Sequence, residues 1–91
     1  MLMVPVNITL GRMYKFPNGM HVIAKGVKIY TKDGDKHRLN GPAEIHPDGH
    51  KIWYKKGIKH RVGGPAVIKP DGTEEYWENG KLLKTLRKES L

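Results

Sequence analysis

The stretch HRLNGPAEIHPDGHKIWYKKGIK, residues 37–59, decides the fold, because the stretch that follows it is a second copy of the same length. Residues 60–82 read HRVGGPAVIKPDGTEEYWENGKL, and ten positions of the two stretches are identical. The repeat period is therefore the offset from His37 to His60. A weaker copy, with Tyr30 in the place of Trp53, occupies residues 14–36. Self-similarity at a fixed period is typical of stacked structural units, and a terminal unit is often degenerate, so we expect three stacked units.

Each unit has the pattern of a β-hairpin. A first strand beginning Gly-Pro-Ala leads into a Pro-Asp-Gly turn, a second strand carries the aromatic residues, and a glycine turn leads into the next unit. Proline fixes φ at the first turn position, and glycine supplies the positive φ that closes the turn. The sequence predicts an all-β protein in which tandem antiparallel hairpins form one elongated meander sheet. Ala43 with Ile45, and Ala66 with Ile68, are its expected core positions.

The chain is expected to be a single domain, since two separate cores would each be too small to be stable. A short helix is expected at its C-terminal end, because Leu82, Leu83 and Leu86 recur at helical spacing. The alternative for this end is a frayed tail. The predicted organisation of the domain 1–91 is an N-terminal strand at 1–13, a degenerate repeat at 14–36, repeats at 37–59 and 60–82, and a C-terminal cap at 83–91.

Two sequence strings resemble a known repeat family. The second strands, WYKKG at residues 53–57 and YWENG at 76–80, are similar to the Tyr-x-x-Gly and Tyr-x-Asn-Gly strands of MORN repeats. The string His-Arg-x-x-Gly-Pro-Ala, followed by Pro-Asp-Gly, resembles a repeat of short proteins from large bacteriophages and giant viruses. The likeness covers residues 14–82. It implies a hairpin fold and a role as scaffold, membrane-lipid binder or antitoxin-like factor.

Positive charge is concentrated in the front two thirds of the chain. The formal net charge is +8, with 17 Lys and Arg against 9 Asp and Glu. Twelve of these basic residues but only four acidic ones lie between Arg12 and Arg61, whereas basic and acidic residues balance from Val62 onward. This asymmetry favours an anionic partner for the front two thirds.

The composition argues against several other classes. There is no cysteine, no secretory leader pattern and no apolar stretch long enough to span a bilayer, so we expect a cytoplasmic protein, in the host cytoplasm if it is viral. His46 and His50 are four residues apart, but a Pro-Asp-Gly turn separates them. We therefore expect no metal site and no cofactor.

The candidate binding residues are the cations of the first two hairpins and one aromatic residue. Lys and Arg bind phosphates, and an aromatic ring stacks on a base. The candidate nucleic-acid or anion-binding residues are Arg12, Lys15, Lys36, His37, Arg38, Lys51, Trp53, Lys55, Lys56, Lys59, His60 and Arg61.

The repeated His-Arg pair has two interpretations. As a ladder along one edge, His37-Arg38 and His60-Arg61 would bind anions, because arginine offers a bidentate fork. As part of the repeat signature, the arginine would pair with a neighbouring carboxylate and the histidine would close a turn. The second interpretation is favoured, and both hold if part of each side chain is exposed.

Adjacent aromatic residues in a strand point to opposite faces of the sheet. We assign Tyr54 and Trp77 to the side of Ile52, in the core, and Trp53 to an exposed contact. The opposite assignment stays open, since short apolar strands give ambiguous faces.

A non-enzymatic function is expected. His37, Glu44, His60 and Arg61 are residue types that a ribonuclease uses, but nothing in the sequence brings them to one point. We expect a phage-type inhibitor or antitoxin-like factor that binds RNA or another nucleic acid, or a protein target such as a toxin ribonuclease. The alternative is a scaffold that pairs through exposed β edges, with a partner chain or as a homodimer. Binding of anionic lipid is a weaker third hypothesis, and no membrane association is expected.

Overall fold

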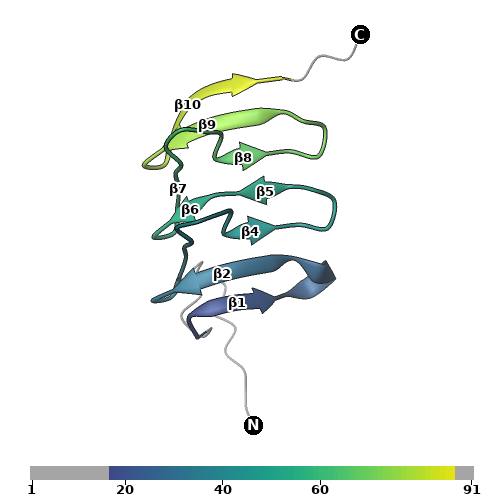
Figure 1. Ribbon diagram of the computed structural model, residues 1–91, viewed down its shortest axis with the longest axis vertical. Coiled ribbons are helices and arrows are strands. Elements are labelled where there is room, and N and C mark those ends of the chain that lie inside the picture. Colours follow the sequence, from purple (N-terminus) through teal and green to yellow (C-terminus); the bar gives the residue numbers. More distant parts are fainter. Residues whose placement is uncertain (1–16, 88–91) are drawn as a thin grey trace.

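The strands follow one another along the long axis of the molecule in nearly the order of the sequence (Figure 1). The computed structural model describes residues 17–87, and they confirm the all-β fold of antiparallel hairpins. The strands are β1 (Gly19–Val22), β2 (Lys28–Lys32), β3 (Asp35–Lys36), β4 (Glu44–Ile45), β5 (Lys51–Ile52), β6 (Tyr54–Lys55), β7 (Ile58–Lys59), β8 (Val67–Ile68), β9 (Glu74–Glu78) and β10 (Lys81–Leu86). One 3-10 turn, Ala24–Gly26, connects β1 to β2.

Within residues 17–87 the main sheet has the order β1-β2-β4-β5-β8-β9-β10, and β3 also pairs with β2. A separate two-stranded ladder joins β6 to β7. Strands β5 and β6 lie in one extended stretch, interrupted only at Trp53. Its first half pairs with β4 and with β8 of the next unit, and its second half pairs with β7. One strand therefore connects neighbouring units.

Two kinds of turn lie on opposite edges of the sheet (Figure 1). The Pro-Asp-Gly turns join β4 to β5 and β8 to β9. In each, an aspartate oxygen accepts the N–H two residues later: His50 donates to Asp48 at 3.0 Å, and Thr73 donates to Asp71 at 2.8 Å. On the other edge, the turn between β6 and β7 has positive φ at Lys56 (51°) and Gly57 (80°). Two consecutive positive φ angles match the twist of a tight hairpin. Asp33-Gly34 and Asn79-Gly80 have the same conformation.

The core is small and follows one row across the sheet. Ile29 pairs with Glu44, which pairs with Ile52, which pairs with Val67. Ile29 and Val67 are buried, and Ile52 is 8% exposed.

The predicted core alanines, Ala43 and Ala66, are fully buried. Ile45 and Ile68 were expected beside them but are only half-buried. They lie in the neighbouring row, where Ile45 pairs with Lys28 and Lys51 and Ile68 pairs with Lys51 and Glu74. The long stems of these charged side chains cover the isoleucines only in part.

The expected C-terminal helix is wrong as far as Leu86, because this segment is strand β10. The Asn79-Gly80 turn sends the chain back along β9, which offers it a full row of hydrogen-bonding groups. A β-bulge between Leu82 and Lys84 interrupts the alternation of side chains. This interruption hides the strand pattern and gives the leucines an apparent helical spacing.

Several expectations fall outside the described residues. They concern the N-terminal strand at 1–13, the first residues of the degenerate repeat, the candidate residues Arg12 and Lys15, and the end of the cap at 88–91.

Candidate functional site

A ladder of cations stacked on aromatic rings runs through the repeat. The guanidinium carbon of Arg61 lies 4.0 Å from the centre of the Trp53 ring, and that of Arg38 lies 3.8 Å from the Tyr30 ring. Lys84 lies over Tyr76 at 4.7 Å, although it belongs to an edge strand. The sequence separation is the same in all three pairs, and successive pairs are one repeat period apart. The same contact therefore joins each aromatic to the segment that follows it.

The remaining residues of the His-Arg-x-x-Gly-Pro-Ala signature hold the arginine in place. Nη1 of Arg61 donates to the carbonyl oxygen of Pro65 at 3.0 Å, and Arg38 makes the same bond to Pro42 at 3.2 Å. A Cβ on Gly64 would lie 2.8 Å from the Arg61 guanidinium carbon, so any larger residue there would displace the guanidinium from this position. The expected carboxylate partner is wrong, because the acceptor is a carbonyl group.

The histidine of the pair closes a turn, as the structural interpretation predicts. Nδ1 of His37 accepts the backbone N–H of Lys56 at 2.9 Å, and Nδ1 of His60 accepts that of Asn79 at 2.9 Å. Each donor is a turn residue with positive φ. The bond links the start of a unit to its own glycine turn.

Trp53 lies on the side of the sheet that carries most of the unpaired cations. In β2 the order is Lys28-Tyr30-Lys32 on this side, and the next unit has Lys51-Trp53-Lys55. All four lysines are exposed, and none makes an ion pair with a carboxylate of residues 17–87. We call this surface the basic face; it consists of Lys28, Tyr30, Lys32, Arg38, Lys51, Trp53, Lys55 and Arg61.

The sign of the charge reverses in the third unit. There Glu74 and Glu78 take the positions of Lys51 and Lys55, on either side of Tyr76. The hydroxyl group of Tyr76 donates to Glu74 at 3.3 Å, which places both on one face of β9. The row of lysines that flank an aromatic residue therefore ends at the third unit, where Lys84 of β10 lies beside these glutamates.

The opposite side of the sheet, which carries Ile52, has its charges paired. Nζ of Lys36 donates to Glu44 at 2.6 Å, and His46 contacts the other oxygen of the same carboxylate. Burial, the largest single influence, opposes ionisation of Glu44, but the hydrogen bonds to Lys36 and His46 and their positive charges together hold its pKa below the usual 4.5.

Trp77 and Tyr54 lie on this second side, as predicted. Nε1 of Trp77 donates to Glu75 at 2.8 Å, and Glu75 belongs to the row of Ile52 and Val67. The bond from Trp77 is the largest influence on Glu75 and lowers the pKa of its carboxyl group. Nζ of Lys36 lies over the Tyr54 ring, 5.1 Å from its centre. Tyr54 and Trp77 are half-buried rather than deeply buried.

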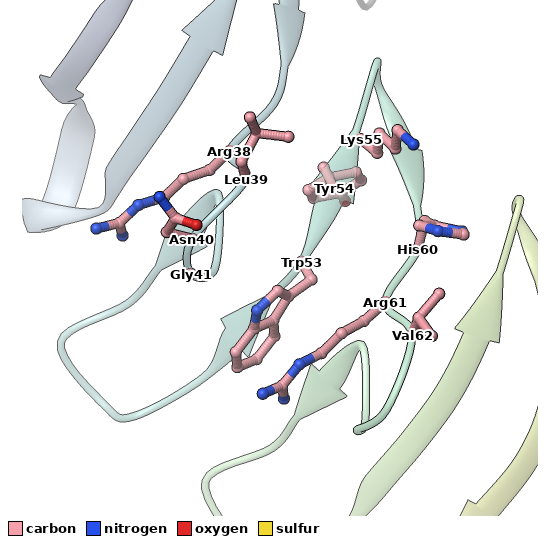
Figure 2. Close-up of a pocket in the computed structure, with 10 residues that line it drawn as sticks. All are labelled: Arg38, Leu39, Asn40, Gly41, Trp53, Tyr54, Lys55, His60, Arg61 and Val62. Atoms are coloured by element: carbon pink, nitrogen blue, oxygen red, sulfur yellow. The ribbon is translucent and has the colours of Figure 1, made fainter.

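A groove opens on the basic face between two loops that occupy equivalent places in successive units (Figure 2). Its volume is about 530 Å³. The side chains of Arg38 and Arg61 extend in the same direction, and the Trp53 ring lies between them (Figure 2). The groove is lined by Arg38, Leu39, Asn40, Gly41, Trp53, Tyr54, Lys55, His60, Arg61 and Val62.

The groove brings together five of the twelve candidate residues: Arg38, Trp53, Lys55, His60 and Arg61. Lys51 is on the same face of the same strand, two positions before Trp53. Trp53 is half-buried, and the guanidinium of Arg61 stacks on its ring, so Trp53 is less exposed than expected.

The structure separates four other candidates from the groove. Lys36 and Lys59 lie on the opposite side, where Lys59 covers the Trp77 ring at 4.5 Å. His37 and Lys56 lie at the turn edge. The four are therefore not part of one contact surface with Trp53.

Eight residues of the basic face and its groove were not among the candidates: Lys28, Tyr30, Lys32, Leu39, Asn40, Gly41, Tyr54 and Val62. The period itself gives three of them, since Lys28, Tyr30 and Lys32 lie one repeat before Lys51, Trp53 and Lys55. The exposed Leu39 and Val62, which also occupy equivalent positions of successive repeats, carried no signal of a site in the sequence.

Comparison of the chain with models of protein families, with curated proteins and with solved structures finds no match. Residues 17–87 contain no group of three or more His, Cys, Asp or Glu residues that could hold a metal ion. None of the described segments is a helix that could cross a membrane.

Proposed function

We propose that the protein is a non-enzymatic nucleic-acid-binding protein that contacts the phosphate backbone of RNA through the basic face. One observation carries the proposal. The exposed lysines flank an aromatic residue in each of two successive repeat units, and glutamates occupy the equivalent positions of the third. Such a change of sign within a repeat separates a polyanion-binding part of the surface from a part in which acidic and basic side chains are mixed.

The pairing of charges supports this choice of face. Lys36 and Lys69 are neutralised by Glu44 and Glu75 on the other side of the sheet. The lysines of the basic face have no such partner among residues 17–87. The two strands that carry equivalent lysines, β2 and β5, have β4 between them and are therefore about 10 Å apart. When a row of unpaired cations binds phosphates, the counterions condensed on the nucleic acid are released. This release is the main source of sequence-independent affinity.

The positions of the candidate acid–base groups favour binding over catalysis. Glu44 is held by Lys36 and His46 on the side of the sheet that carries Ile52, whereas Arg61 lies on the basic face. Nδ1 of His60 is occupied by the N–H of Asn79. An inhibitor or antitoxin-like factor built this way would act by covering RNA, or by occupying the RNA site of a toxin ribonuclease.

Charge reversal tests the proposal. Labelled single-stranded RNA is titrated with the wild-type protein and with Lys51→Glu/Lys55→Glu, at low and at near-physiological salt. The control variant, Lys25→Glu/Lys81→Glu, changes the net charge equally outside the basic face. We expect a loss of at least about tenfold in affinity for the first variant and much less for the control. Equal losses, or no binding by the wild-type protein, would refute the proposal.

A second candidate function, a scaffold, is favoured by strand β10. Every residue of β10 is exposed, and Leu82, Leu83 and Leu86 are each about half exposed. Among residues 17–87, only β9 pairs with it. An open apolar edge accepts a strand from another chain. Sedimentation of the wild-type protein and of Thr85→Pro distinguishes the scaffold function from RNA binding. A scaffold forms an assembly that is insensitive to salt and that the proline abolishes.

A further inference from the structure

We infer that the groove between the loops 38–41 and 60–62 receives an unpaired base, so that the ligand of the basic face is a single strand rather than a duplex. The inference rests on the proposed function and adds the class of nucleic acid and the contact that selects it. A duplex presents phosphates on its outside and keeps its bases stacked, so it has no base to offer a groove.

The apolar rim of the groove points to a base. Leu39 is 76% exposed and Val62 is 74% exposed, the two highest values among the large apolar side chains of residues 17–87. Both line the groove, one from each loop. Two aliphatic side chains have neither a charge nor a hydrogen-bond donor for a phosphate. They can cover the face of a base, which removes apolar surface from water. Their positions are equivalent in the repeat, so the base would lie between matching loops.

The polar groups of the groove match the remaining parts of a nucleotide. Arg38 and Arg61 each use Nη1 for a proline carbonyl, and the described residues provide no acceptor for Nε and Nη2. These N–H groups remain for a phosphate or for the edge of a base. Lys55 is exposed at the same groove and adds a further charge for the phosphate.

The size and shape of the groove fit one base with its sugar and phosphate. Its volume of about 530 Å³ is that of a small-ligand site. The contact with Arg61 holds the Trp53 ring in place beside the opening (Figure 2). A preformed aromatic platform reduces the entropy lost on binding. One groove of this kind is complete in residues 17–87, since β10 follows the third unit in place of another loop.

Tryptophan fluorescence tests the inference directly. The chain has 2 tryptophans, so Trp77→Phe leaves Trp53 as the only one, and Trp77 does not line the groove. This variant is titrated with a short single-stranded oligouridylate and with an RNA duplex of the same number of phosphates. We expect quenching of Trp53 by the single strand, with at least about fivefold tighter binding than the duplex.

A second variant separates the base contact from the charge contact. In the Trp77→Phe background, Leu39→Ala/Val62→Ala removes only exposed apolar side chains, so the fold is retained, which circular dichroism checks. We expect about a fivefold loss for the single strand and none for the duplex.

The outcomes distinguish this inference from the proposal on which it rests. Equal, salt-dependent binding of single strand and duplex without quenching of Trp53 would overturn the inference and leave the proposed function standing. An unchanged affinity of Leu39→Ala/Val62→Ala for the single strand would also overturn it. Absence of binding to both RNAs would overturn both.

Discussion

The guanidinium group of Arg61 lies over the groove-lining Trp53 at 4.0 Å while its Nη1 binds the carbonyl oxygen of Pro65. A single side chain thus joins an aromatic of one unit to the segment that precedes β8 in the next. The exposed part of the same guanidinium faces the groove. The arginine therefore serves the repeat and the proposed binding surface together.

Removal of this arginine should destabilise the protein. We expect Arg61→Ala to lower the free energy of unfolding by about 2 kcal/mol, through loss of the cation–π contact and the bond to Pro65. Urea denaturation measures the change. Arg87→Ala serves as the control, because Arg87 is exposed beyond the end of β10. Equal stability of the two variants would contradict the structural role.

The glycine that packs against the arginine should be sensitive to a single methyl group. Gly64→Ala places a Cβ 2.8 Å from the guanidinium carbon of Arg61, and Gly41→Ala places one 3.1 Å from that of Arg38. The guanidinium must move away from Trp53 in the first variant, so we expect a loss of about 1–2 kcal/mol and a change in tryptophan emission. Gly41→Ala should cost less. The account fails here if Gly64→Ala leaves both properties unchanged.

Replacement of one turn residue should stabilise the protein. Lys56 has φ of 51°, a left-handed conformation that asparagine adopts more readily than lysine. The third unit has Asn79 at the equivalent position. We expect Lys56→Asn to raise the free energy of unfolding by about 0.5 kcal/mol. Lys55→Asn, in the adjacent strand, is the control; a melting temperature of Lys56→Asn no higher than that of the control would be the contrary result.

The stability of the protein should fall in acid partly because of Glu44. Its pKa in the folded state lies below 4.5, so its contribution to stability is present above that value and is lost as the pH falls through the folded pKa. We expect unfolding free energies measured by urea to decrease over this range in the wild-type protein, and less steeply in Glu44→Gln. The control is Glu78→Gln on an exposed residue of β9. A wild-type slope in Glu44→Gln would show that the carboxylate is not favoured in the folded state.

The fold was largely predictable because local turn chemistry and repeat period agree. Pro-Asp-Gly and Lys-Gly turns leave the strands between them little choice of register. The last strand, β10, was missed because its bulge between Leu82 and Lys84 breaks the alternation that marks strands. The strand conformation of residues 81–86 depends on pairing with β9, and the local sequence of these residues gives no information about that pairing.

The candidate site was predictable only in part. The cations of the first two hairpins were expected on one surface, and Lys51, Lys55 and Arg61 do share one. Lys36 and Lys59 have the same charge but lie on the other side, paired with Tyr54 and Trp77. The face of a residue near a hairpin turn depends on register, and composition does not record it. The groove likewise depends on how closely two loops approach.

The salt dependence of RNA binding tests the central claim most directly. For a single strand, the slope of log affinity against log salt concentration has a magnitude of about 0.7 per phosphate contacted by a cation. Lys51→Gln/Lys55→Gln should therefore reduce the slope of the wild-type protein by about 1.4. Lys25→Gln/Lys81→Gln, with the same loss of charge, should leave it unchanged. Equal slopes for the two double variants would contradict the assignment of the phosphate contacts to the basic face.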